Sequence, residues 1–144
     1  MSVAQSTNNS KIKISVKDSK YATGRRKTSI AKIWLKKGSG QISINGKDYK
    51  EYFKRANHKM QLLRPFEIIN EQTSYDVRCN VKGGGLSGQV GALVHGISKA
   101  LVMFDSNSKT TLKKEKLTTR DSRAVERKKY GHRKARRSFQ FSKR

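Results

Sequence analysis

Apolar and polar residues are arranged along the first half of the chain in the short patterns of half-buried strands. Every second residue is apolar in Lys11–Lys17 ("KIKISVK"), and Ile30–Leu35 ("IAKIWL") is rich in β-forming residues. We expect Ile30–Leu35 to pair with Gln41–Ile44 as a hairpin through a turn at Gly38-Ser39-Gly40. The dipeptide Asn45-Gly46 predicts a second turn directly afterwards.

Apolar residues recur at helical spacing between Gln89 and Phe104, which predicts the clearest helix and the main core element. Its apolar positions are Val90, Leu93, Val94, Ile97, Leu101 and Phe104. Three shorter helical segments are expected. They are "YKEYFKR", "LRPFEII", in which Pro65 opens a helical turn, and the basic "KTTLKKEKL".

The stretch "YDVRCNV" predicts another strand, in which Cys79 shares one face with Val77 and Val81. We therefore interpret Cys79, the single cysteine, as a small core residue. Strands and helices without regular βαβ alternation predict an α+β fold, with about four strands in a mixed sheet and helices packed on one face.

Positive charge is concentrated in the last quarter of the chain, and this predicts a division into a body and a basic extension. The formal net charge is +24. Residues 1–108 hold 19 basic and 7 acidic residues, whereas residues 109–144 hold 15 and 3, so a quarter of the chain carries half of the excess. We expect a flexible N-terminus over residues 1–10, a globular body over residues 11–108 and a long, extended basic extension over residues 109–144. From Thr118 onward no apolar periodicity remains, and this part should be extended or disordered when free.

Such an excess of positive charge favours a large polyanion as partner. Nucleic acid is preferred over a membrane, because no apolar run approaches the ~20 residues of a spanning helix. Three clusters can supply phosphate contacts: "GRRK", the glycine-rich turn "KGGG" before the long helix, and the tail. The residues expected to bind are Arg25, Arg26, Lys27, Lys82, Gly83, Gly84, Gly85, Arg120, Arg123, Arg127, Lys128, Lys129, Arg133, Lys134, Arg136 and Arg137.

Catalytic patterns are weak by comparison. The three histidines have no zinc-ligand spacing, and His95 is interpreted as a packed or surface residue of the long helix. The turn Gly83–Gly88 is not a nucleotide-binding P-loop, because no Gly-Lys-Ser/Thr follows it. Its glycines can instead permit a tight turn and close packing. We expect no enzymatic activity, no metal and no cofactor.

Three ordered stretches resemble one known family. "YATGRRKTSIAKIWLKKGSGQISING", "VKGGGLSGQVGALVHGISKAL" and "LTTRDSRAVERKKYGHRKARRSFQFSKR" are similar to small ribosomal subunit protein nine in its bacterial or organellar form. The resemblance runs from about Lys20 to Arg144. It implies the fold known as ribosomal protein S5 domain-2-like, and a structural place in the subunit head on 16S-type rRNA.

The resemblance also implies a role for the tail, which in the family threads through rRNA to the P site. By this comparison Lys143 and Arg144 contact P-site tRNA, and small-subunit proteins ten and fourteen are neighbours. The expected location is the ribosomes of a bacterial cytoplasm, with an organelle as the alternative. The competing hypotheses are a free-standing RNA- or DNA-binding module or RNA chaperone, and a phosphate-binding enzyme that uses Gly83–Gly88.

Overall fold

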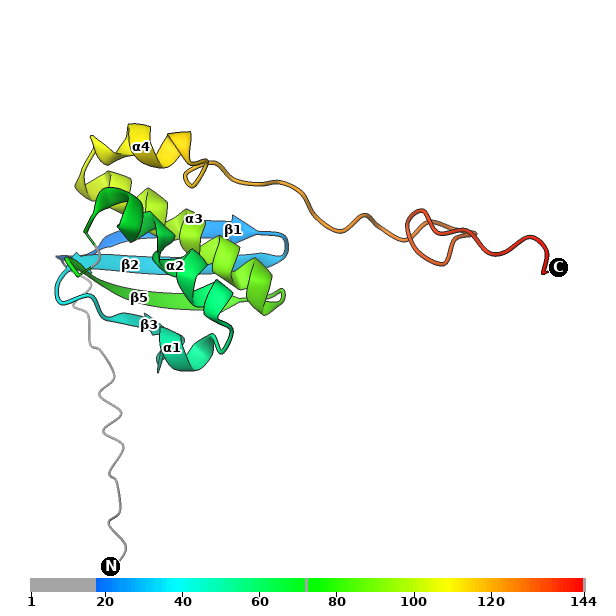
Figure 1. Cartoon of the computed structure of the whole chain (residues 1–144), viewed down its shortest axis with the longest axis horizontal. Helices are drawn as coiled ribbons and strands as arrows, with labels where there is room; N and C mark the ends of the chain where they lie inside the picture. Colours follow the sequence, from blue (N-terminus) through cyan, green and yellow to red (C-terminus); the bar gives the residue numbers. More distant parts are fainter. Residues whose placement is uncertain (1–17, 72, 144) are drawn as a thin grey trace, which may run out of the picture.

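The computed structural model describes residues 18–71 and 73–143. Within these residues, five strands and four helices follow one another (Figure 1). Their order is β1 (Lys20–Arg26), β2 (Ser29–Lys37), β3 (Ile42–Ile44), β4 (Lys47–Asp48), α1 (Tyr49–Tyr52), α2 (Ala56–Ile69), β5 (Tyr75–Lys82), α3 (Leu86–Phe104) and α4 (Ser108–Lys114). The predicted strand at Lys11–Lys17 and the N-terminal segment 1–10 lie outside the described residues.

The α+β prediction is confirmed, with helices α2 and α3 covering one face of a single mixed sheet (Figure 1). The sheet has five strands rather than about four, in the order β1-β2-β5-β3-β4. The sequence interpretation missed β1, because Gly24 interrupts the apolar pattern of "YATGRR", and it missed the two-residue strand β4.

The predicted hairpin between Ile30–Leu35 and Gln41–Ile44 is wrong. Strand β2 pairs antiparallel with β1 and β5, whereas β3 lies on the far side of β5 and runs parallel to it. The linker crosses the end of β5, where Asp76 accepts hydrogen bonds from the backbone N–H groups of Ser39 (2.8 Å) and Gln41 (2.9 Å). These bonds direct the chain past β5 instead of back along β2.

The turn at Asn45-Gly46 is confirmed, and it joins β3 to β4 with Ile44 opposite Lys47. Both turn residues have positive φ, 51° and 82°, which is the two-residue turn that Asn-Gly favours. The short helix in "YKEYFKR" is also confirmed as α1.

The two main helices differ in their starting points from the prediction. Helix α3 begins three residues before Gln89, at Leu86, and ends at Phe104 as expected. Helix α2 begins at Ala56, so Pro65 lies inside it and does not open it. Pro65 is buried, and a proline removes only one backbone hydrogen bond from a helix that tertiary packing already holds.

The core lies between the sheet and the helices. In α3 the residues Val90, Leu93 and Ile97 are fully buried, as their spacing predicts. Cys79 is confirmed as a buried core residue, and burial raises the pKa of its thiol. Leu112 of α4 is fully buried in the same core, so the first residues after the expected boundary at 108 pack on the body.

Beyond α4 the described chain has no further helix or strand as far as residue 143. Figure 1 shows this segment, in orange and red, leaving the body and forming one small loop before its end. The loop carries a single β-bridge between His132 and Ser138, and Gly131 at its start has a φ of 72°.

Candidate nucleic-acid interface

The first basic cluster lies at the β1–β2 turn. Arg25 and Arg26 are the last residues of β1, and Lys27 occupies the turn with a φ of 51°. Arg25 and Lys27 are exposed, whereas Arg26 is partly covered. The stem of Arg26 packs on the first turns of α3, because a Cβ at Gly91 would lie 2.9 Å from its Cγ.

The glycine-rich turn lies beside this cluster. The hydroxyl of Ser29, the first residue of β2, donates a hydrogen bond to the carbonyl of Gly83 at 3.0 Å. The side-chain amide of Gln89 donates to the same carbonyl at 3.2 Å. These hydrogen bonds hold the turn that follows β5 against the β1–β2 turn. Lys82, the last residue of β5, is exposed beside them.

Glycine is required here by two measurable constraints. Gly83 and Gly84 have φ of 76° and 63°, which L side chains rarely adopt. A Cβ at Gly84 would lie 2.2 Å from the hydroxyl oxygen of Ser29. The turn is thus built for close packing, as one of the two sequence interpretations proposed.

The same turn leaves the start of α3 open to solvent. Gly85 is the N-cap and makes no side-chain cap hydrogen bond, and Leu86 and Ser87 are exposed. Free N–H groups at a helix N-terminus attract anions, so phosphate contact by this turn stays a prediction that the geometry permits.

The beginning of the tail is attached to the body, and we call Leu117–Arg123 the tail root. Leu117 packs against the core, and His95 of α3 makes a hydrogen bond with the backbone of Thr118. The guanidinium of Arg26 pairs with Asp121 at 2.9 Å and donates to the carbonyl of Arg123 at 2.7 Å.

Asp121 organises this junction. Its carboxylate accepts hydrogen bonds from the backbone N–H of Arg123 (3.0 Å) and from the Arg123 guanidinium (2.9 Å). These bonds, with the nearby charge of Arg26, hold the pKa of Asp121 well below its usual range. The carboxylate is therefore charged at any physiological pH.

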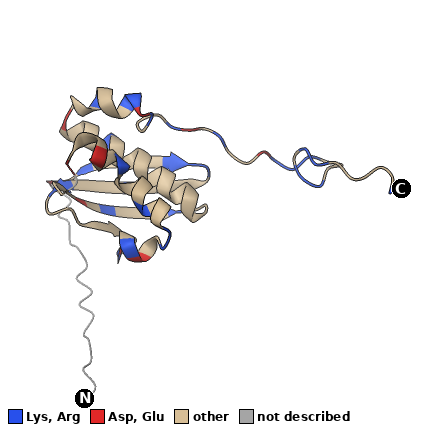
Figure 2. Ribbon diagram, in the orientation of Figure 1, with Lys and Arg blue, Asp and Glu red and all other residues tan. Residues whose placement is uncertain are grey.

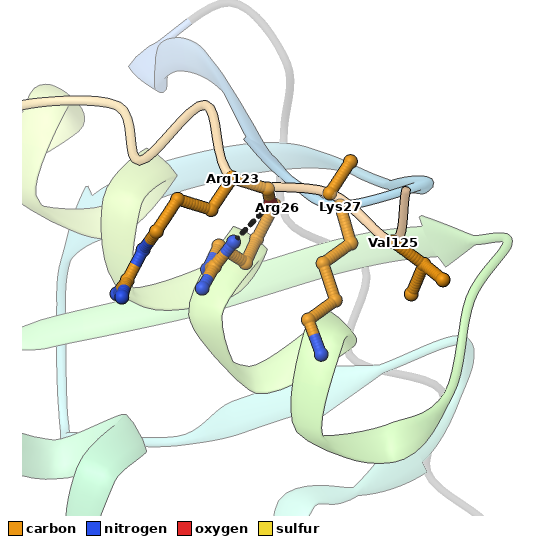
Figure 3. Close-up of a pocket in the computed structure, with 5 residues that line it drawn as sticks. Arg26, Lys27, Arg123 and Val125 are labelled. Carbon is orange, nitrogen blue, oxygen red and sulfur yellow. Dashed lines mark hydrogen bonds between the residues drawn. The ribbon is translucent and has the colours of Figure 1, made fainter. Parts of the chain in front are cut away.

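A basic pocket of about 260 Å³ lies where the tail root meets the β1–β2 turn. Figure 3 shows the charged ends of Arg26, Lys27 and Arg123 directed to the same side of this pocket. Ala124 and Val125 complete its lining. Three cations against the single carboxylate of Asp121 leave an excess of positive charge, which suits a phosphate group.

The predicted tail cations beyond the tail root are not brought to the body. Arg120, within the tail root, is exposed, as is Arg127. Glu126 pairs with Arg136 at 3.0 Å and with Lys129 at 3.9 Å. Figure 2 shows Lys and Arg recurring along the whole segment. Lys128, Arg133, Lys134, Arg137 and Lys143 are also exposed, and Arg144 lies outside the described residues.

Sequence reasoning missed Asp121, because one acidic residue in a basic run carries no pattern of its own. His95, interpreted from the sequence as a packed or surface residue, is partly buried. The Nδ1 of His95 accepts a hydrogen bond from the backbone N–H of Arg25 at 3.3 Å. Burial, and then the charge of Lys99, lower the pKa of this histidine.

Within the described residues, no group of three or more histidine, cysteine or carboxylate side chains could hold a metal ion. None of the helices in that same part of the chain is long and apolar enough to cross a membrane.

One comparison with known proteins bears on this surface. A family model described as ribosomal protein S9/S16 matches residues 24–144. The match begins at Gly24, directly before the β1–β2 turn, and continues through the glycine-rich turn, the tail root and the tail. It therefore spans every element that forms the basic surface.

Proposed function

The chain belongs to the ribosomal protein S9/S16 family, whose members are structural rRNA-binding proteins of the small ribosomal subunit, and we propose that its tail reaches tRNA in the P site. The body binds rRNA in the subunit head, and the tail continues inward between rRNA segments. Within the subunit, small-subunit proteins ten and fourteen lie next to it, and the ribosomes are those of a bacterial cytoplasm or of an organelle.

One observation supports this proposal most directly. The basic tail, which has no hydrophobic core of its own, is attached to the body beside the basic pocket. Arg26 holds Asp121 and the carbonyl of Arg123, so the tail leaves the body from the place where body cations gather. One rRNA backbone can therefore contact the pocket and the first tail cations together, and the next residues follow it.

The composition of the tail suits an rRNA environment. The seventeen residues that close the chain, "KKYGHRKARRSFQFSKR", contain eight Lys or Arg and no carboxylate. Tyr130 and Phe141 are fully exposed, and the Arg133 guanidinium lies 5.2 Å from the ring centre of Phe139. Guanidinium and aromatic planes stack on bases, and the cations neutralise phosphates, which offsets the entropy lost when the tail is ordered.

The tip of the tail is assigned the tRNA contact. Lys143 is exposed, and Gln140 donates a hydrogen bond to the carbonyl of Ser142 at 2.8 Å, which bends the chain just before the tip. Lys143 and Arg144 together offer two cations to the backbone of the anticodon stem-loop. A phosphate backbone is recognised by such contacts whatever the tRNA sequence, as a P-site ligand requires.

A site-directed photocrosslink tests this assignment. Cys79 is fully buried, and its raised pKa keeps it protonated, so a cysteine introduced at the surface is the reactive thiol of the described chain. Small subunits are assembled with Lys143→Cys carrying a benzophenone, and with Lys109→Cys on α4 as the matched control.

We expect P-site tRNA to crosslink to the probe at position 143 and not to the probe at position 109. Crosslinks from position 143 to rRNA alone, with tRNA bound in the P site, would exclude the tRNA contact. That result would leave the rRNA-binding role of the body unchanged.

A further inference from the structure

The sheet has a second face, opposite the helices. Its aromatic side chains belong to none of the predicted rRNA-binding clusters, whereas Arg25 and Lys82 of those clusters lie at one end of it. Figure 1 shows α2 and α3 on one side of β1, β2 and β5 only. On each strand the residues that alternate with the core point to the other side. We call this the open face and define it by Tyr21, Lys32, Trp34 and Arg78.

One row of the open face places two aromatic rings and a guanidinium side by side. Tyr21 is opposite Trp34 in the β1–β2 register, and Trp34 is opposite Arg78 in the β2–β5 register. The ring centres of Tyr21 and Trp34 are 5.4 Å apart at an interplanar angle of 45°. The Arg78 guanidinium carbon lies 6.0 Å from the centre of the Trp34 ring.

This row is not hidden by packing. Tyr21 is 45% exposed, Arg78 is exposed and Trp34 is partly exposed. Ile30, on the same face, is 46% exposed. Large side chains this exposed, side by side on one face of a sheet, are accessible to a ligand.

The charge of the open face is strongly positive. Lys32 lies one row from Trp34, opposite Asn80, and Arg25, Lys36 and Lys82 share the face. Among the described residues, no carboxylate pairs with Lys32, Arg78 or Lys82, while Lys36 pairs loosely with Asp18 at 3.7 Å.

The acidic residue of this face is already engaged. Asp76 accepts hydrogen bonds from Ser39 and Gln41 of the linker. Burial alone would raise the pKa of Asp76, but these backbone hydrogen bonds outweigh it and lower the pKa. The carboxylate of Asp76 is therefore occupied by the loop, and within the described part of the chain Lys32, Arg78 and Lys82 have no carboxylate partner.

We propose that the open face binds an unpaired RNA nucleotide, whose base stacks on the Tyr21–Trp34 pair while Lys32 and Arg78 contact its flanking phosphates. Aromatic rings that alternate with cations on a sheet surface favour a ligand that has both flat aromatic groups and negative charges. A protein partner would need acidic and apolar groups in alternation to match them. A paired nucleotide is excluded, because the bases of a duplex are stacked on one another and offer no free plane.

This inference rests on the RNA-binding role of the protein but not on the contact between the tail and tRNA. The open face and the tip of the tail use different residues. The two proposals can therefore fail separately.

Trp34 makes the test direct, because the chain contains one tryptophan. The full-length protein is titrated with a single-stranded oligouridylate and with an RNA duplex of the same length at ~0.15 M salt. Binding is followed by anisotropy of the labelled RNA, and stacking is followed by the fluorescence of Trp34. The anisotropy of the RNA reports binding to any part of the protein, including the tail. The fluorescence of Trp34 reports only binding close to its ring.

We expect saturable quenching of Trp34 by the single strand and less than one-fifth of that quenching by the duplex at equal occupancy. Tyr21→Ser should raise the midpoint of quenching by about fivefold or more, since stacking on an aromatic ring is worth about 1–3 kcal/mol per base. Arg78→Gln should act in the same direction. Lys113→Gln is the control. It removes one charge from α4, which does not belong to the open face, and should change the midpoint of quenching less than twofold.

A second measurement examines the assembled subunit. Small subunits are irradiated with ultraviolet light, and nucleotide adducts on the peptides that contain Tyr21 or Trp34 are identified by mass spectrometry. An RNA adduct on either ring supports the proposal. Equal quenching by duplex and single strand, or a subunit in which the peptides crosslink to another protein and not to RNA, would overturn it.

Discussion

Arg26 and Asp121 form an ion pair of 2.9 Å that joins the end of β1 to the root of the tail. The side chains are 22% and 34% exposed, so the pair lies at the edge of the body and not in its core. Exposed pairs add little to global stability. The effect of this pair is instead local, because it fixes where the tail leaves the body.

Replacing Asp121 with asparagine should release the tail root without unfolding the body. The carboxylate forms an ion pair with Arg26 and accepts hydrogen bonds from Arg123, and a neutral amide can replace neither the charge nor both acceptor oxygens. We expect trypsin to cleave after Arg123 several-fold faster in Asp121→Asn. The matched control is Glu126→Gln, whose partners Lys129 and Arg136 lie within the tail. Equal cleavage rates at Arg123 in both variants would contradict the attachment.

Gly24 and Gly96 allow β1 and α3 to approach each other closely. A Cβ at Gly24 would lie 1.9 Å from the carbonyl oxygen of Ala92 and 2.5 Å from the backbone nitrogen of Gly96. Backbone cannot move aside as a side chain can, so Gly24→Ala should lower the free energy of unfolding by about 3 kcal/mol. Urea denaturation measures this change. Gly85→Ala is the control, since its Cβ would meet nothing within 4 Å, and it should shift the midpoint little.

The hydrogen bond between His95 and Arg25 predicts a pH dependence of stability. Burial, and then the charge of Lys99, lower the pKa of His95 in the folded state. The neutral Nδ1 accepts the N–H of Arg25, and a protonated ring could no longer do so. The unfolded chain, with the ordinary pKa of about 6.5, then binds a proton first as the pH falls. This contribution to the free energy of unfolding is thus full above that value and declines below it.

Urea unfolding at pH 7.5 and pH 5.5 measures this effect. His95→Gln keeps an acceptor but cannot titrate, so it should reduce the loss of stability between the two pH values. His132→Gln, in the exposed tail, is the control and should leave the pH dependence unchanged. A wild-type pH dependence in His95→Gln would assign the titration to another group.

The tail cations should set the salt dependence of RNA binding. Arg137 and Lys134 are exposed and make no ion pair with a described carboxylate. Replacing both with glutamine should reduce the slope of log K against log salt by roughly 1.4 for single-stranded RNA, at about 0.7 per cation released. The same double substitution at Lys113 and Lys114 of α4 is the control. It tests whether the loss of any two cations reduces the slope equally. An unchanged slope in the tail variant would show that the tail does not meet phosphate.

Periodicity predicted the parts of the fold that depend on burial alone. The spacing of Val90, Leu93 and Ile97 identified α3, and the alternation around Cys79 identified β5. The placement of Gln41–Ile44 beside β5 depends on hydrogen bonds from the linker to Asp76, which no local pattern encodes. Strand β1 was missed because the residues on its core side, Ala22 and Gly24, are small. Small residues permit a close approach to α3 but give no hydrophobic pattern.

The candidate site was predictable in composition but not in arrangement. The clusters around Arg26, Gly83 and Arg123 are each visible as basic or glycine-rich stretches. Their meeting at one end of the sheet follows from the β1–β2 register and from Asp121, and both are tertiary facts. The Tyr21–Trp34–Arg78 row was invisible for the same reason, since it depends on the β1–β2 register and on the pairing of β2 with β5, which is distant in sequence.

The most direct test of the central claim is the affinity of P-site tRNA for small subunits that lack Ser142–Arg144. These subunits are compared with wild type and with Lys143→Ala by competition between labelled and unlabelled tRNA. We expect normal assembly and a loss of affinity of about tenfold, equivalent to about 1.4 kcal/mol, for the removal of both tip cations. Trimmed subunits that hold tRNA as tightly as wild type under competition would contradict it.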